Sequence, residues 1–160
     1  MSVQATPVNT PGTYAGWVVT PDQVREFMRD FPDKNILVDG VEFADNDIER
    51  AIRMTISMGN AIARPTSYSV TSFPNDYVLL QGVCSYLLKS EGIRQLRNEA
   101  MFQDGNIQPV GLDNKQQAYA ALASQYLQEF TQMLTAIKIQ DNMNTFGHMT
   151  SPLAQSTYIR

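Results

Sequence analysis

The amino-acid sequence predicts an all-α fold, a compact bundle of about four helices held between two extended arms. Apolar residues recur every three or four positions in four separate stretches, which is the spacing of one helix face. Segments rich in Pro, Gly and hydroxyl residues separate those stretches. The 160 residues, 43% of them hydrophobic, suffice for one core without disulfides or metals. We therefore predict an N-terminal arm over 1–19, a helical domain over 20–140 and a C-terminal arm over 141–160.

The first helix is predicted to begin after Thr20. Thr20 is a good N-cap, Pro21 suits the first helical position, and Gln23 completes a capping box. One apolar face then ends before the next proline and consists of Val24, Phe27, Met28 and Phe31.

Residues 35–44 contain Asp39-Gly40 and form either a tight hairpin or an extended connection. The second helix is predicted from Asp45 or Asn46 to Ala63, with Glu49 placed for a reciprocal cap. Its buried stripe is predicted to consist of Ile48, Ala51, Ile52, Thr55, Ile56, Met58 and Ile62.

Residues 64–75 contain two prolines and no periodicity, which predicts a loop. A third helix should start at Asn75 or Asp76 and reach Met101, and its two glycines weaken it or permit close packing. Its expected inner face consists of Val78, Leu79, Val83, Tyr86 and Leu87.

The fourth and longest helix is predicted over 113–139, after a second loop at 103–112. At 1.5 Å per residue it spans roughly 40 Å, so it either crosses the whole domain or packs on a neighbouring subunit. After Asn142 the periodicity ends, and the remaining residues are predicted to be extended.

Charge is scarce at both ends of the chain. The net charge is −4, yet residues 1–20 carry no ionisable side chain, and residues 140–160 contain only Asp141, His148 and Arg160. The acidic balance argues against tight binding of nucleic acid or of an anionic membrane. We expect a soluble intracellular protein, because no signal-peptide pattern and no run of roughly 18 apolar residues is present.

No constellation of residues predicts an enzyme or a cofactor site. The single histidine, His148, and the single cysteine, Cys84, are far apart in sequence, and phosphate-binding glycine motifs are absent. The basic residues of the second and third helices are expected to form a solvated face with intrahelical pairs to Glu91 and Glu99. We therefore predict no catalytic residue, no metal ligand and no cofactor.

Two parts of the sequence resemble the head-to-tail connector proteins (adaptor or neck proteins) of tailed bacteriophages. The first part is NILVDGVEFADNDIERAIRMTISMGNAIARP, in which residues 41–45 lead into a helix that closes with Asn60 before Pro65. The second is FPNDYVLLQGVCSYLLKSEGIRQLRNEAMFQDGN, in which residues 87–90 are followed by Arg97-Asn98 and Asp104-Gly105. The resemblance extends over about residues 20–155, because the long helix and a polar tail follow.

The resemblance implies a non-enzymatic structural protein of the virion neck, assembled in the host cytoplasm. It implies a homo-oligomeric ring, usually of twelve subunits, below the portal protein and above a tail-side neck or tail terminator protein. Double-stranded DNA would pass through the lumen without sequence-specific binding, and no membrane would be involved. A tail-completion or baseplate-proximal protein, or a cytosolic helical interaction module, remains the alternative.

The resemblance also indicates contact residues. The C-terminal arm is the expected portal-docking segment, and its apolar residues fit pockets on a partner. These candidates are Met143, Phe146, His148, Met149, Leu153, Tyr158, Ile159 and Arg160. The two loops and the end of the third helix are expected to contact other subunits or the tail side through Tyr68, Phe73, Arg97, Asn98, Asp104 and Asn106.

Overall fold

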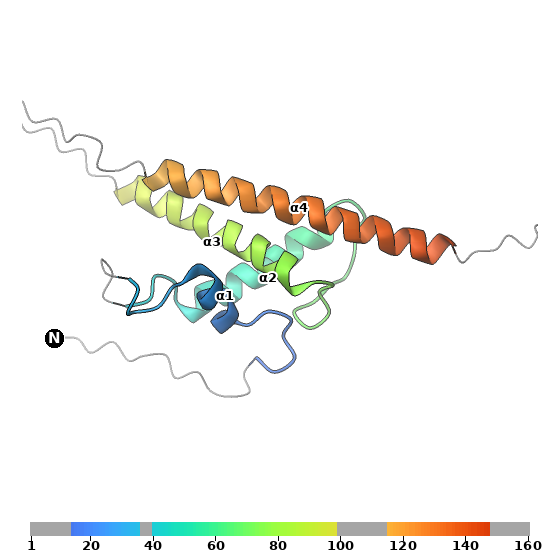
Figure 1. Ribbon diagram of the computed structural model, residues 1–160, viewed down its shortest axis with the longest axis horizontal. Helices are drawn as coiled ribbons and strands as arrows, with labels where there is room; N and C mark the ends of the chain where they lie inside the picture. The colour runs from blue at the N-terminus through green and yellow to red at the C-terminus, as the bar shows by residue number, and fades with distance from the viewer. Residues whose placement is uncertain (1–13, 36–39, 99–114, 148–160) are drawn as a thin grey trace, which may run out of the picture.

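A computed structural model of the chain describes residues 14–35, 40–98 and 115–147 (Figure 1). These residues form four helices and no strand, which confirms the all-α prediction. The helices are α1 (Pro21–Met28), α2 (Asp45–Ala61), α3 (Asp76–Asn98) and α4 (Lys115–Gly147). Figure 1 shows α3 and α4 as a long antiparallel pair, with α1 and α2 packed on α3. The possible hairpin turn lies partly at 36–39, outside the described residues.

The core lies where α2, α3 and α4 meet. Phe130 of α4 is fully buried against α3 and α2. A Cβ added to Gly82 would stand 2.4 Å from the Thr55 methyl carbon and 2.8 Å from the Phe130 ring, so only glycine allows this approach. The other fully buried apolar residues include Val19, Val24, Ile48, Ile52, Leu79, Val83 and Leu134.

The N-terminal part of the bundle begins earlier than predicted. Val19 is buried in the core, and Trp17 and Val18 pack against it. The amide of Val18 donates to the carbonyl of Val70 at 2.8 Å, which ties this segment to the α2–α3 connection. Trp17, Val18 and Val19, which the prediction assigned to the arm over 1–19, therefore pack on the bundle.

Helix α1 has the predicted capping box but ends early. The Gln23 amide donates to Thr20 Oγ1 at 3.4 Å, and the Thr20 amide donates to Gln23 Oε1 at 2.8 Å. The helix stops at Met28 because Arg29 adopts a left-handed conformation, with φ 59°. Phe27, expected inside, is exposed.

The buried carboxylate of Asp30 fixes the connection from α1 to α2. Asp30, 4% exposed, accepts hydrogen bonds from the amides of Glu42 at 2.7 Å and Phe43 at 3.0 Å. It also accepts from Arg25 at 3.3 Å and from Asn35 Nδ2 at 2.6 Å. Arg25 in turn reaches Asp45 in the first turn of α2 at 2.5 Å. This network holds the chain where it reverses direction between α1 and α2. The periodicity of α1 does not predict that reversal.

Helix α2 begins at Asp45, as predicted, but lacks the predicted reciprocal cap. Ala44 is the N-cap and makes no side-chain hydrogen bond. Glu49 instead accepts a hydrogen bond from the Tyr14 hydroxyl at 2.7 Å. This bond raises the pKa of Tyr14 to about 12, with burial adding to the effect.

Helices α3 and α4 differ from prediction at their surfaces and ends. Tyr86, expected on the inner face of α3, is exposed. Helix α4 has 33 residues and spans about 50 Å. The extended conformation predicted from residue 141 onward is wrong for residues 141–147, because the sequence there has no proline to stop the helix.

The glycines of α3 provide a matched pair of substitutions. We expect Gly82→Ala to destabilise the fold by roughly 2 kcal/mol, because the new methyl group overpacks Thr55 and Phe130. At Gly92 the nearest atom to an added Cβ is at 3.5 Å, an ordinary contact. Gly92→Ala should therefore stabilise α3 by up to about 1 kcal/mol. Urea unfolding of both variants measures the difference, and equal effects would contradict the close approach at Gly82.

The Asp30 network is tested in the same way. We expect Asp30→Asn to lower the free energy of unfolding by about 3 kcal/mol, because it removes one of the two carboxylates that pair with buried Arg25 and turns an amide group toward backbone donors. The control is Asp33→Asn, because Asp33 pairs with Lys34 at an exposed site. The control should change stability by less than about 0.5 kcal/mol.

Candidate interaction site

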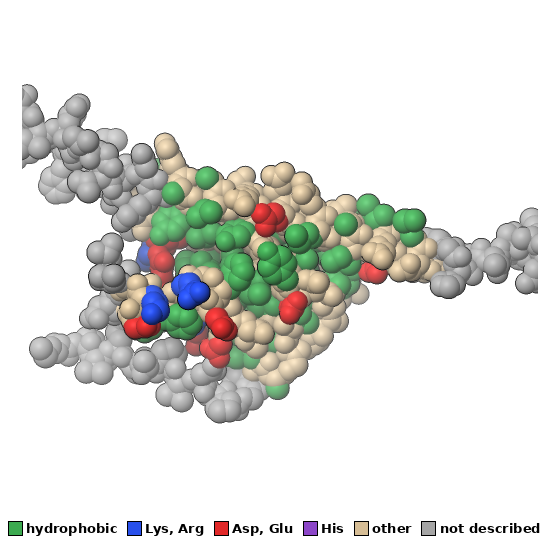
Figure 2. Space-filling view, in the orientation of Figure 1, with side chains coloured by type: hydrophobic (Ala, Val, Ile, Leu, Met, Phe, Trp, Pro, Cys, Tyr) green, Lys and Arg blue, Asp and Glu red, His purple; other side chains and the backbone are tan. Residues whose placement is uncertain are grey.

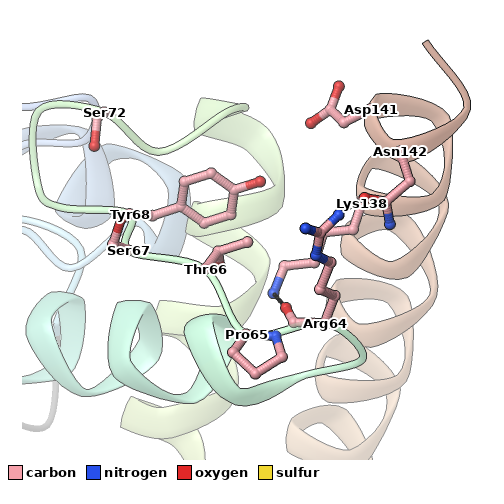
Figure 3. A pocket seen from close by; sticks show the side chains of 9 residues that line it. All are labelled: Arg64, Pro65, Thr66, Ser67, Tyr68, Ser72, Lys138, Asp141 and Asn142. Atoms are coloured by element: carbon pink, nitrogen blue, oxygen red, sulfur yellow. Dashed lines mark hydrogen bonds between the residues drawn. The ribbon is translucent and has the colours of Figure 1, made fainter. Parts of the chain in front are cut away.

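A hollow lies between the α2–α3 connection and the C-terminal half of α4 (Figure 3). Its volume is about 490 Å³. Most of the residues that line it have polar or charged side chains, and the full set is Arg64, Pro65, Thr66, Ser67, Tyr68, Ser72, Lys138, Asp141 and Asn142. One side of the pocket is therefore the loop that was predicted to contact partners. The other side is the helix that leads to the predicted docking arm.

Lys138 joins the two sides of this pocket. Its side chain leaves α4 and is 3% exposed. The ammonium group donates to the carbonyls of Gly59 at 2.6 Å, Ile62 at 2.8 Å and Arg64 at 2.9 Å. The last carbonyls of a helix have no partner within it and carry partial negative charge, so a lysine here caps α2.

The environment of Lys138 shows that it positions the site and is not free to bind a ligand. All three of its N–H groups point at backbone carbonyls. Burial lowers the pKa of the ammonium group, whereas the three acceptors favour its charged form. The Nζ atom also lies 5.6 Å from the centre of the Tyr68 ring, within cation–π range.

Asn60 holds the loop wall of the pocket. Its Oδ1 accepts from the Tyr68 amide at 2.8 Å and from Thr66 Oγ1 at 3.0 Å, and its Nδ2 donates to the Tyr68 carbonyl at 2.9 Å. The amide of Thr66 adds a bond to the Asn60 carbonyl at 3.1 Å. One side chain at the end of α2 thus fixes the backbone that presents Tyr68.

The outer rim of the pocket is charged and accessible. The Arg64 guanidinium donates to Asn142 Oδ1, and Figure 3 shows these two side chains directed toward each other. Asp141 lies one residue earlier on α4 and is exposed. Burial raises the pKa of Tyr68, and the Asp141 charge raises it further. The rim can therefore form hydrogen bonds and ion pairs with a partner.

The structure divides the predicted contact residues into three groups. Tyr68 lines the pocket, Arg97 is exposed near the end of α3, and Met143 is exposed on α4. Phe73 is a correction: it is buried in the core, edge-on to Tyr68 with ring centres 5.5 Å apart, and cannot contact a partner. Asn98 is the last residue of α3 and Phe146 the last but one of α4, but their side chains are not described. Outside the described residues lie Asp104, Asn106, His148, Met149, Leu153, Tyr158, Ile159 and Arg160.

The sequence alone assigned no role to Lys138, and it marked Asn60 only as the close of the helix before Pro65. A signal for Lys138 was present, because it stands four residues after Leu134 and eight after Phe130, on the buried stripe of α4. A lysine on such a stripe requires acceptors. Asn60 offered no comparable pattern, because its partners belong to an irregular loop.

Cys84 does not form a reactive centre with any neighbour. It is fully buried, and burial raises the pKa of the thiol to about 12, so the thiolate is scarce at neutral pH. Within residues 14–35, 40–98 and 115–147 there is no group of three His, Cys, Asp or Glu residues that could hold a metal ion. In the same ranges no helix is long and apolar enough to cross a membrane.

Comparison with protein-family models, with curated proteins and with solved structures gives no match to this chain.

The role of Lys138 is open to a direct test. Lys138→Met keeps the length and the apolar stem but strands the carbonyls of Gly59, Ile62 and Arg64. We expect a loss of about 2 kcal/mol in chemical unfolding, together with faster amide exchange over residues 62–72. Lys34→Met, at an exposed lysine, should change neither quantity appreciably. Unchanged exchange in Lys138→Met would contradict the proposed capping of α2.

Proposed function

We propose that this chain is a structural virion protein of the head-to-tail connector (adaptor or neck) type. In this proposal it forms a ring below the portal protein, contacts a tail-side neck or tail terminator protein, and surrounds the DNA passage. It acts in the neck of the virion as a non-enzymatic component. The proposal originates in the sequence resemblance described above and is supported by the features that follow.

The observation that carries the proposal is the projection of α4 beyond the bundle, visible at the red end of the helix in Figure 1. Residues 139–147 follow Lys138, the last buried contact, and add about 14 Å of helix. Ile139 is 52% exposed and Met143 is 68% exposed. A helix end with exposed apolar residues fits docking into a groove on a partner.

The arrangement at the root of this projection also supports docking. Lys138, just before the projecting end, and the Arg64–Asn142 bond, within its first residues, fix the helix to the α2–α3 connection. A docking helix that is already held in place loses less conformational entropy on binding. The predicted docking segment, residues 148–160, continues from this helix in the sequence.

The net charge of the chain favours a ring through which DNA passes over a protein that binds nucleic acid tightly. A net charge of −4 opposes strong overall attraction to phosphates. A ring through which DNA slides must avoid strong attraction. The proposed DNA contact is therefore passage through the lumen.

Locating the protein in phage particles tests the proposal. The expected result of electron microscopy on particles carrying a tagged chain is density between portal and tail, in a symmetric ring. Density at the baseplate would favour a tail-completion or baseplate-proximal protein. Absence of the chain from purified particles would favour a cytosolic interaction module and overturn the proposal.

The projecting end of α4 yields a second expectation. Ile139→Asp/Met143→Asp should weaken binding to the portal protein of the same phage at least tenfold, because charged groups replace the apolar contact residues. Titration calorimetry or surface plasmon resonance would measure the dissociation constant. Gln140→Asp adds a charge to the same exposed helix end without removing an apolar side chain, so it should bind nearly as wild type. Equal affinity of the double variant and wild type would exclude this docking role.

A further inference from the structure

Two sides of the bundle carry large apolar side chains that are not buried. The first, here called the α1/α4 face, contains Phe27, Tyr77, Leu122, Tyr126 and Met133. The second, here called the α2/α3 face, contains Met54, Met58, Tyr86 and Ile93. Single exposed apolar residues are ordinary on protein surfaces, but groups of them mark contact sites.

The α1/α4 face is continuous. Leu122, Tyr126 and Met133 share one flank of α4, at spacings of four and seven residues. The Phe27 ring of α1 lies 6.2 Å from the Tyr126 ring, and Tyr77 of α3 is near enough to raise the Tyr126 pKa. Figure 2 shows apolar side chains joined across α1, α3 and α4 on this side of the molecule.

The α2/α3 face is built by two helices. Residues 47, 50, 54 and 58 recur at helical spacing and form one exposed stripe of α2. Asp47 and Arg50 of this stripe line a hollow of about 180 Å³ together with Tyr86 of α3. The exposed side of α3 continues from Tyr86 through Lys89 and Ile93 to Arg97.

The two faces point in opposite directions. Tyr77 and Tyr86 are nine residues apart on α3, which at about 100° per residue places them on opposite sides of the helix. A two-fold dimer uses the same surface of both copies. Two patches on opposite sides of the molecule cannot both lie in one such contact. They suit a head-to-tail contact, in which one face of each copy meets the other face of the next.

The charges on the two faces are complementary. Asp76 and Glu129 accompany the apolar residues of the α1/α4 face, and Figure 2 shows acidic side chains along its borders, with basic ones gathered at one end. Arg50, Lys89 and Arg97 are exposed on the α2/α3 face. Of the three carboxylates at its hollow, Glu42 and Glu91 pair with Arg94, and Asp47 is exposed. These three cations make no ion pair with another residue of the described part of the chain.

We propose that the α1/α4 face of one copy docks on the α2/α3 face of the next, so that copies of this chain assemble head to tail. Apolar side chains supply the centre of the contact, and the opposite charges set its orientation. The closure of this contact into a ring rests on the proposed function. The contact itself does not.

Two double variants, each blocking one face, test the proposal in the full chain. Leu122→Lys/Met133→Lys blocks the α1/α4 face, and Met54→Lys/Ile93→Lys blocks the α2/α3 face. All four residues are exposed, so circular dichroism should show unchanged helix content. Gln128→Lys is the control, because Gln128 is exposed on α4 and lies about 140° around the helix from Met133, away from both faces.

Analytical ultracentrifugation should give a wild-type and control mass that rises with concentration beyond a dimer. Each double variant alone should stay at the monomer mass of 17.9 kDa. An equimolar mixture of the two should form dimers of twice 17.9 kDa and stop there, because each variant retains one intact and complementary face. Raising the salt to 1 M should weaken wild-type association.

Three results would overturn the proposal: a wild-type chain that stays monomeric, a double variant that assembles like wild type, or a mixture that does not dimerise. The proposed function has a separate outcome. If the mixture does not dimerise although the protein is present in a neck ring, these two faces are rejected and the connector function stands. If the protein assembles head to tail but is absent from virions, the two faces stand and the connector function is rejected.

Discussion

The approach of three helices around Phe130 sets the geometry of the whole bundle. The ring packs where Gly82 of α3 has no side chain, beside Thr55 of α2. Gly59 of α2 also makes room for the Phe130 ring and for Leu134. A Cβ at Gly59 would lie 3.1 Å from Leu134 and 3.3 Å from Phe130. These two glycines let α4 lie close to both neighbours, since packing distance between helices depends on the side chains at the contact.

Two buried charged groups fix what the apolar core leaves undetermined. Hydrophobic contacts are non-directional, so they do not specify how the chain reverses after α1 or where α2 stops. Asp30 specifies the first through the amides of Glu42 and Phe43, and Lys138 specifies the second through three carbonyls. Both are fully paired, which is the condition under which a buried charge is tolerated. The pocket beside Lys138 exists because the chain leaving α2 is held there.

Periodicity within the sequence was sufficient to predict four helices, most of the core and the capping box at Thr20. It failed where contacts join distant residues. The chain reversal after α1 depends on Asp30 accepting hydrogen bonds from amides twelve and thirteen residues later. Helix α3 is apolar on several sides, so spacing alone placed Tyr86 inside although it is exposed. The pocket depends on hydrogen bonds from Lys138 to carbonyls at and just beyond the end of α2, 74 to 79 residues earlier in the chain. No local sequence pattern encodes such a pairing.

The proposed contacts use surfaces that do not overlap. The projecting end of α4 begins after Lys138, whereas the apolar flank of α4 in the α1/α4 face ends at Met133, and the α2/α3 face uses other helices. A subunit could therefore bind one neighbour on each side and a third protein at the end of α4 at the same time. That separation matters for a connector, because its ring must stay closed while the portal is bound. Since α4 reaches from the α1/α4 face to the projecting end, a single rigid helix would hold the two kinds of contact in register.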